Sequence, residues 1–278
     1  MEASCAIALI LVVISNILQA IATSKFLSRR NSGNFSMQSW KQLDPDYIKE
    51  HFQASVSDTG IHSITTITKA IALFFIFVPI IQVSWILSNG GKKRLSTHVA
   101  ICVLAIAGGI CELVVNLMMI GTNSMTAWLA SSFNLDDWDS EGDGQGWRVL
   151  ELMTMMMRGM MTWVNALEWI SIFLIMTIIF FSIRNEKRHN PNSQVLFGSK
   201  WAILGLVIGI LGLFEFIADL LRLRSWFLFM KVSFAIYIIN MLILLPIWLV
   251  VLGRQLTSIK DRFEDWGNDE ATPLNEMN

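Results

Sequence analysis

Residues 159–183 read GMMTWVNALEWISIFLIMTIIFFSI, a stretch whose single charged residue is Glu168. An α-helix needs about 20 mostly apolar residues to cross the ~30 Å hydrocarbon core of a bilayer, and this stretch is long enough. Its apolar residues are continuous and do not alternate with polar ones, which excludes the strands of an outer-membrane barrel. The stretch therefore predicts a transmembrane helix.

Five further stretches have the same character, and together they predict an all-α, polytopic transmembrane helix bundle. The composition agrees, because only 15% of the 278 residues are charged, against roughly 25% in an average soluble domain. The 21 Lys and Arg residues nearly balance the 22 Asp and Glu residues, so the net charge does not indicate a protein that binds nucleic acid. The composition also excludes disordered proteins and small disulfide-linked proteins. The six predicted spans cover 4–24, 64–88, 98–122, 159–183, 201–221 and 226–253.

The first stretch has an alternative interpretation as a cleaved signal peptide. It ends in Gln19-Ala20-Ile21-Ala22, which has the small-x-small pattern of a signal cleavage site. However, its start carries no Lys or Arg, and Asn16 and Gln19 interrupt the apolar run. We therefore favour a retained membrane helix; cleavage would leave five spans.

The loops predict the orientation of the bundle. Loops 89–97 and 184–200 are rich in Lys and Arg, which marks the cytoplasmic side. The loops 25–63 and 123–147 are then external, and the one N-x-S/T glycosylation sequon, at Asn34, lies in the first of them. We expect a plasma membrane or endomembrane protein with both termini in the cytosol, and a disordered acidic tail over 254–278.

Polar residues inside the predicted spans are the main functional signal. A charge at the centre of a bilayer costs about 2.5–3.5 kcal/mol even on lenient insertion scales, so each one needs a partner or a proton. At 1.5 Å per residue, the three glutamates fall roughly 9–14 Å below the external surface. The candidate intramembrane residues are Glu112, Asn116, Asn165, Glu168, Glu215 and Asp219.

Several of these residues share a helical stripe with small residues. Small side chains let helix backbones approach, and polar ones form hydrogen bonds across the contact, so such stripes predict packed seams. On the third span the stripe comprises Ala105, Gly109, Glu112 and Asn116. On the fifth span it comprises Gly205, Gly209, Gly212, Glu215 and Asp219.

Two interpretations of the intramembrane acids remain open. In the first, the acids form a structural network with nearby cations, and in the second they form a cation or proton site. We weigh the structural network above the ion site, because the inner half of the bundle is almost free of polar residues. The candidate charge partners are Lys69, Arg158, Arg222 and Lys231.

Other motifs give weaker signals. Six methionines crowd 153–161, and thioethers suit Cu(I), but flexible packing accounts for them better. The segment that begins at Asp137 imitates a calcium loop, yet its twelfth position is Arg148 and not a bidentate Glu. No histidine is placed for haem, and no hydrolase or phosphate-loop motif occurs. We expect no catalytic residue, no metal and no cofactor.

The absence of recognisable chemistry favours a non-catalytic membrane scaffold or partner-assembly protein. The alternative is a cation or proton-coupled transporter or channel that uses Glu112, Glu168 and Glu215, and an intramembrane enzyme ranks third. The expected partners are the lipid bilayer and other membrane proteins or a second copy of the chain, with a small cation in the alternative. Nucleic acid is not expected.

Overall fold

The computed structural model describes residues 2–29, 44–88, 94–133, 135–138, 144–189, 197–222, 232–233 and 235–270. These ranges are almost entirely helical and contain no strand, which confirms the all-α class. The elements are α1 (Glu2–Arg29), α2 (Pro45–Leu87), α3 (Leu95–Ser132), the 3₁₀ turn η2 (Leu135–Trp138), α4 (Gln145–His189), α5 (Ser199–Arg222), the π-helical segment η3 (Ile238–Leu244) and α7 (Leu245–Glu270).

Within the described residues, six helices are long and apolar enough to cross a membrane, which confirms the polytopic bundle. Their mean hydropathy lies between 2.2 and 2.6 when measured over the best window of each. The chain is therefore an integral, multi-pass membrane protein. The segments are Ala3–Ala22, Gly60–Leu87, Leu95–Ser132, Gln145–Arg188, Ser199–Leu221 and Ala235–Ile259.

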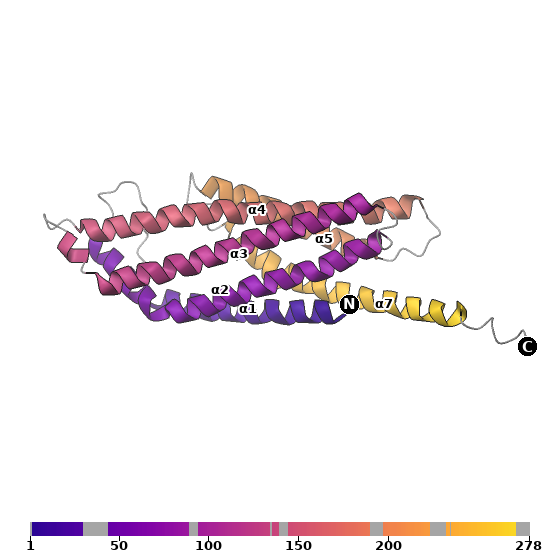
Figure 1. Ribbon diagram of the computed structural model, residues 1–278, viewed down its shortest axis with the longest axis horizontal. Coiled ribbons are helices and arrows are strands. Elements are labelled where there is room, and N and C mark those ends of the chain that lie inside the picture. The colour runs from indigo at the N-terminus through magenta and orange to yellow at the C-terminus, as the bar shows by residue number, and fades with distance from the viewer. Residues whose placement is uncertain are drawn as a thin grey trace, which may run out of the picture.

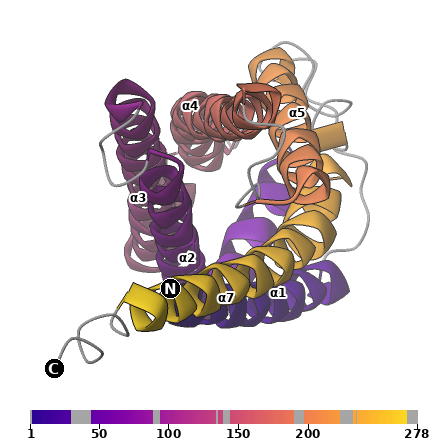
Figure 2. The ribbon, with the colours of Figure 1, turned by 90° about the vertical axis from the view of Figure 1, so that its right-hand side faces the viewer.

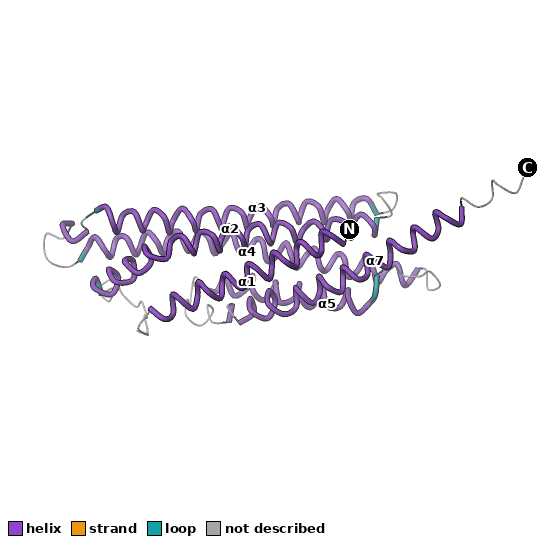
Figure 3. The backbone as a smooth tube through the Cα atoms, turned by 90° about the horizontal axis from the view of Figure 1, so that it is seen from below, coloured by secondary structure: helices purple, strands orange, loops and turns teal. Residues whose placement is uncertain are grey.

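The helices lie lengthwise beside one another in an elongated bundle (Figure 1). Seen from its end, the bundle is a ring in which α1, α2, α3, α4 and α5 follow one another and α7 closes the gap between α5 and α1 (Figure 2). The last turns of α7 extend beyond the bundle (Figure 3). Sequential helices are thus spatial neighbours, as short connections between antiparallel helices require.

Three helices extend well past the predicted spans on the side of the predicted external loops. Helix α2 begins at Pro45, α3 continues to Ser132 and α4 begins at Gln145, so the described parts of 25–63 and 123–147 are largely helical. These extensions and η2 bury a separate apolar cluster of Ile48, Phe52, Leu135, Trp147 and Leu150. The sequon at Asn34 lies outside the described residues.

The C-terminal helix is also longer than the sequence analysis expected. The last span was predicted to end at 253, with a disordered tail from 254, whereas α7 continues as a helix to Glu270. Its apolar side stays buried as far as Ile259, which is 2% exposed, so packing accounts for the extension up to that residue. Residues 271–278 of the predicted tail lie outside the described part.

Two glycines of α5 show that this helix packs closely against α4. A Cβ atom on Gly209 would lie 3.0 Å from Cβ of Met176 and 3.4 Å from the carbonyl oxygen of Phe173. A Cβ atom on Gly212 would lie 3.3 Å from the carbonyl oxygen of Trp169. The stripe on α5 therefore packs against the backbone of α4, which positions Glu215 and Asp219 inside the bundle.

Candidate functional site

The polar stripe of α3 faces the interior of the ring. Ala105, Gly109, Glu112 and Asn116 are all buried, and the last two are each only 2% exposed. They share a face because their spacing matches the 3.6-residue period of the helix. The stripe therefore presents a carboxyl and an amide to α2 and α4, the two helices that flank α3.

Lys69 of α2 is the ionic partner of Glu112. The Nζ atom of Lys69 lies 3.3 Å from Oε1 of Glu112. Asn116 donates from Nδ2 to the same Oε1 at 2.6 Å and to the backbone carbonyl of Glu112 at 2.7 Å. One carboxylate oxygen thus accepts from both a cation and an amide, an arrangement that partly replaces the hydration that the buried group has lost.

Glu168 of α4 adds a second acid at the same place. Its side chain is 1% exposed, and it lies close enough to Glu112 and Lys69 for the charges of the three groups to influence one another. The second oxygen of Glu112, Oε2, is buried and has no hydrogen-bond partner in the described part of the chain. Lys69, Glu112 and Glu168 are called the charge trio below; it holds two acids for one base.

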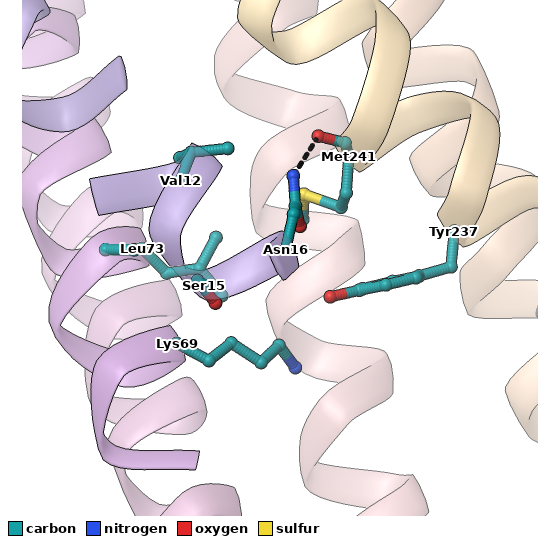
Figure 4. Close-up of a pocket in the computed structure, with 8 residues that line it drawn as sticks. Val12, Ser15, Asn16, Lys69, Leu73, Tyr237 and Met241 are labelled. Carbon is teal, nitrogen blue, oxygen red and sulfur yellow. Dashed lines mark hydrogen bonds between the residues drawn. The ribbon is translucent and has the colours of Figure 1, made fainter. Parts of the chain in front are cut away.

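A small cavity adjoins the trio on the side of Lys69. It is lined by Ser15 and Asn16 of α1, by Lys69 and by Tyr237 and Met241 (Figure 4), and its volume is about 10 Å³, close to the space needed by one water molecule. Lys69 retains 23% exposure, more than either acid of the trio. Its Nζ atom is 5.5 Å from the centre of the Tyr237 ring, within cation–π range.

The π-helical segment η3 forms one wall of this cavity. The amide of Leu245 donates to the carbonyl of Asn240, five residues earlier, so the π partner of the Met241 carbonyl would be position 246. That position is Pro246, which has no N–H. Asn16 fills this place by donating from Nδ2 to the Met241 carbonyl at 3.3 Å, as Figure 4 shows.

The remaining predicted acids form a second group on α5. Glu215 is 3% exposed and Asp219 is 1% exposed. Asn165 of α4 donates from Nδ2 to Oδ2 of Asp219 at 2.7 Å, and the Ser233 hydroxyl donates to Oε1 of Glu215. Tyr237 lies in the field of Glu112, Glu168 and Glu215 together, so this group borders the charge trio.

The four predicted charge partners of the acids differ in their surroundings. Lys69 contacts an acid, whereas the Arg158 side chain is exposed and forms no ion pair within the described ranges. The Arg222 side chain and Lys231 lie outside what the structure describes. Lys69 is thus the charge partner that the described part of the chain assigns.

Sequence reasoning did not single out Tyr237, Ser233 or the lining role of Ser15. Tyr237 has a recognisable signal, since it is one of only two tyrosines in a chain rich in Phe and Trp. Its hydroxyl is costly within a membrane unless a polar group lies nearby. Ser15 and Ser233 carry no such signal, because a serine hydroxyl within a helix can bond to its own backbone.

No family model, curated protein or solved structure matches the chain. The function is therefore argued from the site alone.

Proposed function

We propose that this chain binds and releases a proton at the charge trio, and that it acts as a proton-coupled transporter or channel. The observation that carries the proposal is that two buried acids, Glu112 and Glu168, share the neighbourhood of one base, Lys69, which lies 3.3 Å from Glu112. With both acids ionised, the trio would hold a net negative charge away from water. One proton held by the two acids makes the trio neutral, as adjacent buried carboxyl groups require.

A purely structural role does not account for Glu168. The Lys69–Glu112 pair already compensates one buried charge, and the polar contact that Glu168 provides is equally available to a neutral glutamine. Ionisable side chains within membrane helices are costly, and proton and ion pathways are where they are retained. The second acid is therefore the group on which the proposal places the exchangeable proton.

The cavity beside Lys69 supports a route for that proton. It brings the Ser15 hydroxyl, the Asn16 amide and Tyr237 next to the exposed part of Lys69. Its volume suits about one water molecule, and a water with several polar partners conducts protons through hydrogen bonds. Larger solutes do not fit this space, which favours a proton or a bare ion as the cargo.

The test is proton flux into lipid vesicles that contain the purified full-length chain and a trapped pH-sensitive dye. An acid step is applied in mixed sodium and potassium chloride with valinomycin, so that charge movement does not limit the flux. We expect Glu168→Gln to abolish the flux while its thermal unfolding stays cooperative. Glu186→Gln, near the C-terminus of α4 and away from the trio, is the matched control. Unchanged flux in folded Glu168→Gln would refute the proposal.

A non-catalytic scaffold is the second candidate, and a specific feature favours it. Polar contacts join different helices: Lys69 with Glu112, Asn165 with Asp219, and Asn16 with the Met241 carbonyl. Such bonds contribute about 0.6 kcal/mol each within membranes and define helix register. If scaffolding is the whole role, Glu112→Gln and Glu168→Gln will both lower stability, and neither wild type nor variants will carry protons.

A further inference from the structure

We infer that the C-terminal end of α4 binds the headgroup of a phospholipid that carries a phosphate monoester in addition to its phosphodiester, as a phosphorylated inositol lipid does. The inference is independent of the charge trio, because Arg184 lies about 24 Å along α4 from Glu168, at 1.5 Å per residue. It is carried by a cavity lined with cations and by an exposed apolar row that leads to that cavity.

The cavity has a volume of about 380 Å³ and is lined by Arg184, Asn185, Lys187 and Arg188. All four side chains are exposed. Neither arginine pairs with an acid in the described part of the chain, and Lys187 does not do so either. Three cations therefore share one space without a described acid to compensate them. A hollow lined by one sign of charge attracts ligands of the opposite sign, so this cavity favours an anion.

The spacing of these residues explains why the cavity is cationic. Arg184, Lys187 and Arg188 stand at i, i+3 and i+4, so they lie on one side of the helix. Glu186 is the acid of this segment, and it lies about 200° around the helix axis from Arg184. Like charges at i, i+3 and i+4 repel one another. A bound anion would remove this repulsion.

Charge and size select the headgroup. A phosphate monoester carries a charge of about −1.5 to −2 at neutral pH, and a phosphodiester adds one more negative charge. Together they match the three cations, whereas a headgroup with one net negative charge would leave two of them uncompensated. The cavity also lies within the range of about 300–1,000 Å³ that is typical of small-molecule sites. The two arginines suit phosphate, because a guanidinium group can donate two parallel hydrogen bonds to it.

The position of the cavity favours a lipid over a free phosphate ester. Arg184 directly follows 169–183, which contain no charge, so the cavity lies at the edge of the hydrocarbon, where lipid phosphates are expected. Leu174 and Phe181 are 38% and 51% exposed. They lie on the same side of α4 as Arg184 and Arg188, because the four residues stand at i, i+7, i+10 and i+14. A lipid whose headgroup fills the cavity can lay an acyl chain along this row.

A neighbouring helix adds positive charge to this end of α4. Arg94, at the start of α3, donates from Nη1 to the Ser182 carbonyl at 3.0 Å, two residues before Arg184. The basic loops predict that this end of the bundle is cytosolic. The cytosolic leaflet carries anionic lipids, and each Lys or Arg near its surface strengthens the attraction.

The experiment measures binding of a fluorescent dioctanoyl phosphatidylinositol monophosphate to the purified full-length chain in non-ionic detergent, with protein-free micelles as the blank. We expect Arg184→Gln, Lys187→Gln and Arg188→Gln each to raise the Kd about fivefold, the effect of one lost cation at an anionic surface. Arg184→Lys keeps the charge but loses the planar fork, so it should also weaken binding. Arg158→Gln is the matched control, because Arg158 is an exposed arginine of the same helix, about 39 Å from Arg184. An unchanged Kd in all three glutamine variants would refute the site.

Competition separates the lipid from other sources of phosphate. Dioctanoyl phosphatidylserine, inositol bisphosphate and sodium phosphate should each need a concentration at least about tenfold higher than the unlabelled lipid to displace the label. Phe181→Ala should weaken binding of the lipid and leave binding of inositol bisphosphate unchanged. Equal competition by inositol bisphosphate would overturn the assignment to a lipid. Equal competition by phosphatidylserine would overturn the requirement for a phosphate monoester.

Discussion

Each residue of the charge trio has a different energetic role. Glu112 lies 3.3 Å from the Lys69 ammonium, and its Oε1 also accepts from Asn116, so the proposal assigns it the ionised form. Glu168 is buried near Glu112 and forms no ion pair within the described part of the chain, and the proposal assigns it the neutral, protonated form. Replacement of Lys69 by an apolar residue therefore removes a charge from the trio, whereas replacement of Glu168 by glutamine does not.

We predict that Lys69→Met destabilises the protein whereas Glu168→Gln does not. Lys69→Met leaves the buried Glu112 carboxylate without its cation. Such a change lowers the free energy of unfolding by about 3–5 kcal/mol in soluble proteins, and by less where water can still hydrate the remaining charge. The second replaces a neutral acid with a neutral amide of the same size. Thermal unfolding in detergent measures both.

The double variant Lys69→Met with Glu112→Leu is the internal control for this prediction. It removes both charges, so it should recover much of the stability that Lys69→Met loses. Equal destabilisation by Lys69→Met and Glu168→Gln would contradict the assignment of the proton to the acid pair.

At the scale of single residues, the sequence predicts the members of the site better than their pairing. Hydropathy and depth identify Glu112, Glu168 and Lys69, because an ionisable side chain within an apolar run is conspicuous. Pairing depends on the rotation of each helix about its axis and on its neighbours, which one sequence does not contain. This is why Lys69 is assigned while Arg158 is exposed.

At the scale of elements, η3 and α1 depend on each other. Pro246 removes the N–H that the Met241 carbonyl would receive in the π pattern, and Asn16 of α1 supplies the replacement donor. Single π-helical turns are rare, are often found at functional sites and have identifiable local causes. Here a proline and a hydrogen bond from another helix are the causes.

We predict that Pro246→Ala makes the Asn16 contact redundant. The new amide can donate to the carbonyls of η3, so Asn16→Ala should cost less in the Pro246→Ala background than in the wild type. The difference should approach the value of about 0.6 kcal/mol typical of hydrogen bonds within membranes. A double-mutant cycle of unfolding free energies measures it, and a coupling of zero would mean that the Asn16 contact contributes nothing.

We also predict that Gly209→Leu separates α5 from α4. The side chain would meet Cβ of Met176 at 3.0 Å and the backbone of Phe173, which has little freedom to move. Overpacking of this kind costs about 1–3 kcal/mol, and the displacement should disturb Glu215 and Asp219. Thermal stability of the purified protein measures the loss.

Ile203→Leu is the control for the glycine prediction, because Ile203 lies on the same helix and is 52% exposed. We expect Ile203→Leu to leave the thermal stability almost unchanged. Equal stability of the two variants would mean that the glycine stripe does not form the seam.

The sequence predicts which helices form more reliably than it predicts how long each helix is. All six spans are predicted, because long apolar runs have few alternatives. The extensions of α2, α3 and α4 are not predicted, because they are stabilised by the separate cluster around Trp147. The residues of that cluster are distant from one another in the sequence. One local signal was available: Asp44 caps α2 through Oδ1 to the Asp46 amide at 3.2 Å, with Pro45 at the first helical position.

At the scale of the whole molecule, the site lies far from the basic loops. Lys69 and Glu112 are each about 25 Å, at 1.5 Å per residue, from the ends of α2 and α3 that meet at loop 89–94. In a hydrocarbon core of ~30 Å, this places the trio nearer the face with the helical extensions. Under the proposed function, the proton is therefore expected to reach the trio first from that face.

We predict that this face is external and that both termini are cytosolic. The basic, acid-poor loops 89–97 and 184–200 motivate the orientation. In sealed vesicles of known orientation, epitopes inserted near 140 and near 270 should lie on opposite sides, with the latter on the cytosolic side. Cytosolic exposure of 140 together with protection of 270 would reverse the orientation.

The central claim is that one proton resides on the buried acid pair at neutral pH. Infrared difference spectroscopy of the purified chain tests it directly, because a protonated carboxyl group has a C=O stretch that a carboxylate lacks. We predict a carboxylic acid band in the wild type that disappears in Glu168→Gln and persists in the Glu186→Gln control. A neutral-pH spectrum in which the wild type and Glu168→Gln show the same carboxylic acid bands would contradict the claim.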